Sequence, residues 1–217
     1  MKKIITLVLF ISMCMAVSSC GAEAPKTSGY KFLKLLLGSV KNYVQVRNQM
    51  KEAGEDPEQI SNLSAKYNLE LNNEMSEVVS LEKESSGYAM EIGTQYFRNY
   101  IQDSTDLNNK MISITKLNNR ESISKEIIIL NLTKSKTYGA LQACILSSAK
   151  MIATPKKGKE DERIQFLLND NEKEALIKDI ESIAETSQIN DKEEVEIVKL
   201  LASIKKMLLA KKYSDLK

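Results

Sequence analysis

Residues 30–59 read YKFLKLLLGSVKNYVQVRNQMKEAGEDPEQ, and this stretch decides the fold. Up to Ala53 its apolar residues recur at three- and four-residue spacing, which predicts an amphipathic helix. Gly54 suits a helix end with left-handed backbone geometry, and residues 56–59 supply an N-cap, a first-turn proline and a capping glutamine for a second helix. The stretch therefore predicts two long helices joined by a short turn.

The same spacing continues along the chain. It predicts helices over about residues 30–53, 57–84, 88–117 and 122–152, one from Asn169 to about 184, and one from about 190 to a lysine-rich end. Residues 127–130, Ile-Ile-Ile-Leu, have the β-branched content of a short strand, but no partner strand is evident, so we favour helix. Helices of ~30 residues are ~45 Å long. We expect an all-α fold, an elongated bundle of five to six helices.

One internal break interrupts this pattern. Residues 154–163 combine Pro155 and Gly158 with a mixed run of charges, so we expect an exposed loop there. Residues 164–168 are read as a short apolar turn. Residues 30–217 then form a single helical domain around this loop.

The N-terminus has the layout of a secretory signal, with Lys2 and Lys3 before an apolar run over residues 4–16. The run is shorter than the ~20 residues of a transmembrane helix. Residues 17–20, Val-Ser-Ser-Cys, resemble the lipobox of bacterial lipoprotein precursors, in which the cysteine is acylated and becomes the first residue of the mature chain. The alternative is an ordinary signal peptidase, which would leave a plain N-terminal thiol.

The resemblance implies a signal peptide over residues 1–19 and a lipid such as palmitate on Cys20. Acyl chains contribute ~0.8 kcal/mol per buried CH2, and two or more give stable membrane attachment. Gly21, in place of aspartate, implies passage to the outer membrane in enteric-type envelopes. Residues 20–29 are small and polar with one proline, which predicts a flexible tether.

Composition bounds the function. Removing Lys2 and Lys3 from the 31 basic residues leaves 29, against 29 acidic ones, so we expect no nucleic-acid partner. With no histidine, Ser-His-Asp, Cys-His and histidine-bearing metal sites are excluded. The acidic residues lie in charged runs and the chain has no tryptophan, which argues against a carboxylate glycosidase. We expect no enzyme, no cofactor and no metal.

Cys144 lies among apolar and small residues and is expected to be a buried, inert thiol. Small residues form two rows at four-residue spacing: Gly139, Ala143 and Ser147, and beside them Ala140, Cys144 and Ser148. Such rows allow close approach of another helix, so the helix over 122–152 is predicted to be central. A cavity for an apolar ligand is the alternative. Ser147 and Lys150 match the S-x-x-K spacing of penicillin-binding proteins, without its companion motifs.

Tyr96, Arg98 and Tyr100 are the candidate interface residues. The two tyrosines are four residues apart on one helix face, and tyrosine and arginine dominate interface hot spots. The alternative is a tyrosine stripe half inside the core with an arginine covering it.

We therefore expect a lipid-anchored protein of the cell envelope that acts as a non-catalytic helical module and binds a protein partner. In composition it resembles the helical surface lipoproteins of spirochaetes, which bind host proteins. The alternatives are an immunity or inhibitor lipoprotein against an envelope toxin or lytic enzyme, and a carboxylate-based hydrolase.

Overall fold

The structure is a computed structural model that describes residues 27–54, 56–85, 87–117, 119–155, 164–187 and 191–210. The predicted signal peptide, Cys20 and the tether up to residue 26 lie outside the described residues. The last part of the predicted tether is helical, because Thr27 caps the first helix at Ser28.

Six α-helices make up nearly all of the described chain, and the all-α prediction is confirmed. They are α2 (Ser28–Ala53), α3 (Pro57–Glu84), α4 (Tyr88–Ile114), α5 (Arg120–Ser148), α6 (Asp170–Thr186) and α7 (Lys192–Leu209). A 3-10 turn, η1 (Ala149–Met151), follows α5. Residues 127–130 are helical, as favoured from the sequence.

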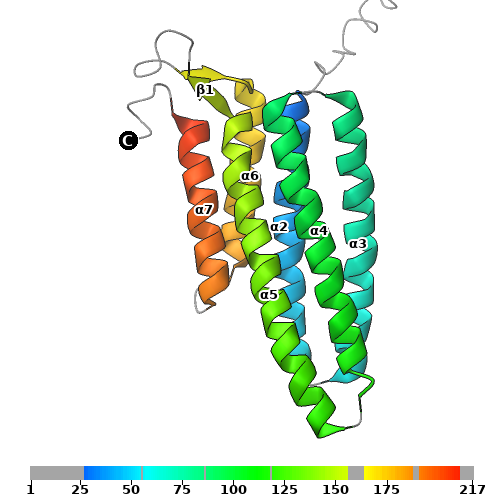
Figure 1. Cartoon of the computed structure of the whole chain (residues 1–217). Coiled ribbons are helices and arrows are strands. Elements are labelled where there is room, and N and C mark those ends of the chain that lie inside the picture. Colours follow the sequence, from blue (N-terminus) through cyan, green and yellow to red (C-terminus); the bar gives the residue numbers. More distant parts are fainter. Residues whose placement is uncertain are drawn as a thin grey trace, which may run out of the picture.

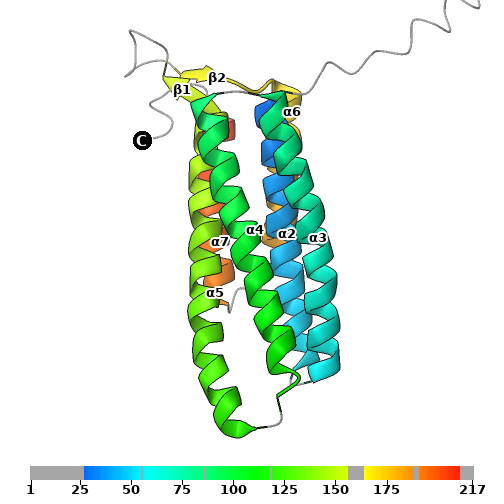
Figure 2. The same cartoon turned by 45° about the vertical axis from the view of Figure 1, so that its right-hand side comes forward.

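The four long helices α2 to α5 run up and down in sequence order, each packed against the next (Figure 1). The shorter α6 and α7 form a second antiparallel pair that packs on α2 and α5 (Figure 2). The start of α2 and the end of α5 lie at one end of the bundle, and the connection between α4 and α5 lies at the other (Figure 1).

Side-chain caps define the helix starts that the sequence predicts. The Asp56 carboxylate accepts the backbone N–H groups of Glu58 and Gln59 at the start of α3. Asn169 and Glu172 form a reciprocal capping box at the start of α6. The buried Glu172 carboxylate also accepts the N–H and the hydroxyl of Thr27, at 2.9 and 3.1 Å. One carboxylate therefore joins the starts of α2 and α6.

The break after α5 differs from the prediction. Residues 153–155 and 164–166 form a short antiparallel pair, β1 (Ala153–Pro155) and β2 (Ile164–Phe166), with Thr154 opposite Gln165. The predicted loop therefore begins after Pro155, and its residues 156–163 lie outside the described residues. The predicted apolar turn is a strand in its first half. Three-residue strands give too short an alternation to be recognised in sequence.

The core is centred on α2, and the prediction that α5 is central is wrong. Buried side chains occur from one end of α2 to beyond its middle: Tyr30, Phe32, Leu33, Leu36, Leu37, Ser39, Val40, Tyr43 and Val44. Because α2 packs against α3 and α6 and also touches α4 and α5, it has neighbours on several sides. Gly93 of α4 allows close approach, since a Cβ there would lie 3.2 Å from Cζ of Phe32 and closer still to Met151.

An ion-pair cluster fixes the start of α7 against α2. Arg47 donates to Asp191 at 2.8 Å and also pairs with Glu193. Lys51 lies 2.9 Å from the fully buried carboxylate of Glu194. Although burial opposes it, hydrogen bonds from Lys51, the Glu194 backbone and Arg47 hold the pKa of Asp191 far below its usual range. The position of α7 along the bundle is thus set by charge as well as by apolar packing.

Candidate functional site

The predicted interface on α4 is divided between the surface and the core. Tyr96 is 40% exposed, and Arg98 forms an ion pair with Glu82 of α3. Tyr100 is fully buried, and its hydroxyl is hydrogen-bonded to that of Tyr67 at 2.8 Å. Residues four apart are offset by ~40° around a helix, which is enough to separate solvent from core at the edge of a stripe. Tyr100 cannot contact a partner in this structure, and its assignment to the interface is corrected.

The predictions for Cys144 and for the Ser147–Lys150 spacing concern the end of α5. Cys144 is fully buried, as predicted, and desolvation raises the pKa of its thiol far above the usual value. Ser147 donates its hydroxyl hydrogen to the backbone oxygen of Cys144 at 2.8 Å. The Lys150 ammonium lies 5.3 Å from the centre of the Tyr88 ring. The S-x-x-K spacing therefore does not join its serine to its lysine.

The rows of small residues on α5 differ from each other. Cys144 and Ser148 of one row are buried, whereas Gly139 of the other row is exposed. A Cβ built on Gly139 would meet nothing within 4 Å. Among the described residues, no helix therefore packs closely against Gly139. This glycine faces solvent and not an enclosed apolar cavity.

The first half of α5 carries an exposed apolar surface that we call the α5 strip. Its members are 42–68% exposed: Ile127, Ile128, Ile129 and Leu132. None of the described side chains between residues 122 and 132 is buried. At about 100° per residue, Ile128, Ile129 and Leu132 lie within one sector of the helix, and Ile127 lies beside that sector. Neighbouring exposed aliphatic side chains of this kind make the strip a candidate interaction surface.

The α5 strip is exposed to solvent because α7 is too short to cover it. Lys134 and Tyr138 of α5 both reach Glu193 in the first turn of α7, through an ion pair of 3.7 Å and a hydrogen bond of 3.5 Å to its backbone oxygen. Since α7 begins beside Lys134, the preceding turns of α5 extend past it. Figures 1 and 2 show this half of α5 beside α4 and below the α6–α7 pair.

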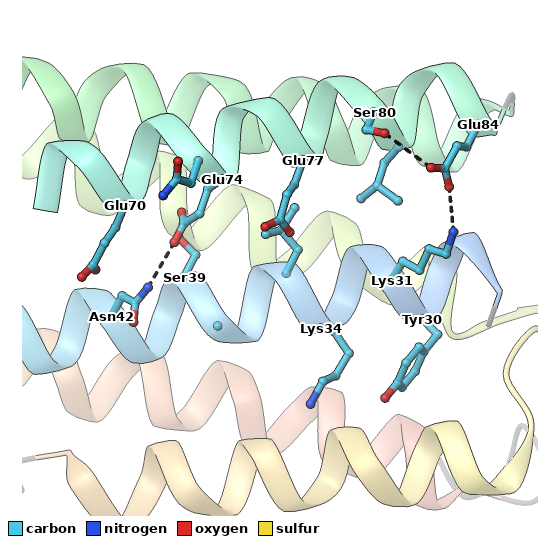
Figure 3. Close-up of a pocket in the computed structure, with 14 residues that line it drawn as sticks. Tyr30, Lys31, Lys34, Ser39, Asn42, Glu70, Glu74, Glu77, Ser80 and Glu84 are labelled. Carbon is cyan, nitrogen blue, oxygen red and sulfur yellow. Dashed lines mark hydrogen bonds and ion pairs between the residues drawn. The ribbon is translucent and has the colours of Figure 1, made fainter. Parts of the chain in front are cut away.

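A second surface feature is an open groove between α2 and α3 with a volume of about 680 Å³. Its apolar lining includes Leu35 and Leu81, and Gly38 lies on the α2 side. Figure 3 shows acidic side chains extending from α3 toward α2, and the pair formed by Lys31 and Glu84 at one end of the groove. We call this the α2–α3 groove.

Glu74 is the buried ionisable group of this groove. Its carboxylate accepts the Ser39 hydroxyl at 2.5 Å and the Asn42 amide at 3.3 Å. Desolvation raises its pKa to about 7; the two hydrogen bonds oppose this shift, and the neighbouring Glu70 and Glu77 add to it. Glu74 was missed from the sequence, although its spacing from the buried Leu71 and Val78 places it on their face of α3.

The groove lacks the arrangement of a glycosidase. Paired-carboxylate catalysis places one acid on each side of the scissile bond. Here Glu70, Glu74 and Glu77 all project from α3, so they line one wall. In the part of the chain that the structure describes, no cluster of histidine, cysteine or acidic residues could hold a metal ion.

In comparisons with known proteins, no family model, no curated protein and no solved structure matches this chain. Within the described ranges, no helix is both long and apolar enough to cross a bilayer.

Proposed function

We propose that this protein is a lipid-anchored module of the cell envelope, outer-membrane attached, that binds a protein partner through the α5 strip without catalysing a reaction. The observation that carries the proposal is the run of exposed aliphatic side chains at 127–129 and 132. Burying one such side chain at an interface contributes about 1.5–3 kcal/mol. Four together can supply the apolar centre of a binding site.

The position of the α5 strip supports this role. A lipid on Cys20 would lie a few residues before Thr27, which caps α2 at the end of the bundle where β1 and β2 pair. The strip lies toward the opposite end, near the α4–α5 connection (Figure 2). The 26 residues of α2 span ~39 Å at a rise of ~1.5 Å per residue. The strip then lies toward the end of the bundle that is farther from the attachment point, where a partner can reach it.

The alternative functions use the same surface differently or not at all. An immunity or inhibitor lipoprotein would also bind a protein, so the identity of the partner separates it from the leading proposal. A carboxylate hydrolase is less well supported, because the acids of the α2–α3 groove share one wall.

The binding proposal is tested by pull-down from detergent-solubilised envelopes with the lipidated chain as bait. The double variant Ile128→Asp/Leu132→Asp places two carboxylates in the strip and should lose the partner. Leu69→Asp is the matched control, because Leu69 is similarly exposed on α3 and outside the strip. Circular dichroism checks that each variant stays folded.

Equal recovery of the partner with the strip variant and with wild type contradicts the proposal. A second contrary result is binding of the strip to lipid vesicles in a flotation assay, with loss of binding in the Ile128→Asp/Leu132→Asp variant. That result would make the strip a membrane contact instead of a protein-binding surface.

The anchoring proposal has its own test. Replacing Cys20 by Ser should leave an unprocessed or soluble precursor, because the acylated thiol is removed. Metabolic labelling with a palmitate analogue should then be lost. Normal processing and membrane attachment of the Cys20→Ser chain would contradict the lipobox assignment.

A further inference from the structure

The end of the bundle at which α2 begins carries a second exposed apolar surface, and we call this end the tether end. The start of α4, the end of α5, the β1–β2 pair and the end of α7 also lie there (Figure 1). Four large side chains of the tether end are 41–71% exposed: Tyr88, Leu146, Leu167 and Leu209. Among the described residues, only Leu69 and Tyr96 are large apolar side chains exposed outside the tether end and the α5 strip. Single exposed apolar residues are ordinary, whereas their concentration in one region indicates a contact surface.

Each of the four residues stands where an element begins or ends. Tyr88 is the first residue of α4, Leu146 lies in the last turn of α5, and Leu209 is the last residue of α7. Leu167 follows directly on β2. These side chains therefore border the end of the bundle.

Two lysines add positive charge to the tether end. The Lys150 ammonium lies 5.3 Å from the centre of the Tyr88 ring, and Lys83 lies in the last turn of α3. Neither lysine forms an ion pair within the described residues, whereas Lys31, in the first turn of α2, pairs with Glu84. Tyrosine and leucine beside lysine suit the level of lipid headgroups, where the apolar part is buried and the ammonium group stays in contact with water and phosphate.

The chain that precedes α2 limits how far the tether end can lie from a membrane. The proposed lipid is on Cys20, and Thr27 caps α2. The chain between these two residues spans at most ~25 Å, even when it is fully extended. This inference rests on the proposed lipid anchor, because that anchor holds the tether end next to the lipid headgroups. The bilayer is then a surface that these side chains can reach without a second protein.

We propose that the tether end lies on an anionic phospholipid surface, with its exposed apolar side chains in the headgroup region and Lys83 and Lys150 paired to lipid phosphates. The acyl chains already supply stable attachment. The added contact fixes the orientation of the bundle, which a tether alone leaves open. The bundle then stands on the membrane, and the α5 strip is held toward the end that points away from it.

The test is quenching of fluorescence in vesicles that hold the full lipidated chain. In a Cys144→Ala background, a single added cysteine carries the dye NBD, either Leu209→Cys at the tether end or Leu132→Cys in the α5 strip. The vesicles contain phosphatidylcholine, phosphatidylglycerol and a lipid that is spin-labelled at its headgroup. We expect strong quenching of the dye at position 209 and little at position 132.

Matched variants separate contact from tethering alone. Tyr88→Asp/Leu167→Asp places two carboxylates at the tether end and should remove most of the quenching at position 209, while the acyl chains keep the protein on the vesicles. Leu69→Asp is the control, because Leu69 is exposed on α3 outside the tether end. Without phosphatidylglycerol the quenching should fall, and Lys83→Gln/Lys150→Gln should abolish this dependence on lipid charge.

Vesicle flotation distinguishes this inference from the anchoring proposal. Protein that floats with the vesicles but shows no quenching at position 209, or equal quenching at positions 209 and 132, overturns the inference alone. So does quenching that survives Tyr88→Asp/Leu167→Asp or that is the same with and without phosphatidylglycerol. Protein that does not float contradicts the lipid anchor, and the inference falls with it. A discrete protein adduct in intact cells from benzoylphenylalanine at position 209 would overturn it as well, because a protein would then cover the tether end.

Discussion

Helix α2 and the first half of α5 are both rich in large aliphatic residues, yet only α2 buries them. In α2 these residues follow one face at three- and four-residue spacing, and other helices pack on that face. In α5 three isoleucines stand at consecutive positions, so they point in directions about 100° apart, and the α5 strip remains exposed. The arrangement of apolar residues, more than their number, thus separates a helix that buries its aliphatic side chains from one that exposes them.

The largest expected difference between the two regions is the loss of stability when one leucine in each is truncated. Leu36 of α2 is 1% exposed and Leu132 of α5 is 68% exposed. Leu36→Ala should lower the free energy of unfolding by ~2–5 kcal/mol, because it leaves a cavity in the core. Leu132→Ala should change it by less than ~0.5 kcal/mol. Urea unfolding followed by circular dichroism measures both, and similar losses would erase the distinction between the two helices.

A smaller change in stability is expected from the titration of Glu74, the carboxyl group of α3 that is buried against α2. Burial raises the pKa of Glu74 from 4.5 to about 7, so the folded state holds this proton more tightly than the unfolded state. The resulting stabilisation is fully present below pH 4.5 and is lost as the pH rises through about 7. The loss amounts to about 3 kcal/mol.

Glu74→Gln keeps the shape of the side chain and removes the charge. The variant should match wild type near pH 5 and be the more stable protein at pH 8. Urea unfolding at both pH values tests this, with Glu185→Gln as the control for a charge removed from an exposed site. A pH dependence that survives unchanged in Glu74→Gln would show that another group is responsible.

The second half of α5 should respond like a core helix. Cys144 is fully buried, so Cys144→Leu should cost ~1–3 kcal/mol through overpacking, whereas Cys144→Ala should be mild. The native thiol should react with a bulky reagent only after denaturant is added. Rapid labelling of the folded protein, with leucine tolerated as well as alanine, would place this half of α5 at the surface too.

The smallest expected change in the free energy of unfolding distinguishes Gly38 of α2 from Gly93 of α4. Gly38→Ala should raise the free energy of unfolding by up to ~1 kcal/mol, because alanine favours the helix and its Cβ meets nothing. Gly93→Ala should instead be destabilising, since its Cβ would press on Phe32 and Met151. Thermal unfolding compares the two variants. A lower melting temperature for Gly38→Ala would mean that an internal contact requires this glycine.

Most of the fold could be predicted from the sequence because it is governed by local patterns. The apolar spacing of α2 to α4, the caps at Asp56 and Asn169 and the break near Pro155 all act over a few neighbouring residues. The central position of α2 could not be predicted, since it depends on how the α6–α7 pair packs. The position of α7 also leaves the α5 strip uncovered. The packing of α4 against α2 and α3 buries Tyr100, whereas Tyr96 stays exposed.

The candidate sites were harder to find from sequence for a related reason. Glu74 resembles its exposed neighbours Glu70 and Glu77 in a charged helix, and only its register with Leu71 and Val78 distinguishes it. Residues 127–130 were noticed for their β-branched content. That they remain exposed follows from the length and position of α7, which no local pattern encodes.

The most direct test of the central claim is photo-crosslinking in intact cells from a benzoylphenylalanine placed at Leu132 or at Leu69. Both positions are exposed leucines, 68% and 66%, on different helices. The α5 strip as a binding surface predicts one discrete protein adduct from position 132 and none from position 69. The same adduct from both positions, or none from either, would contradict it.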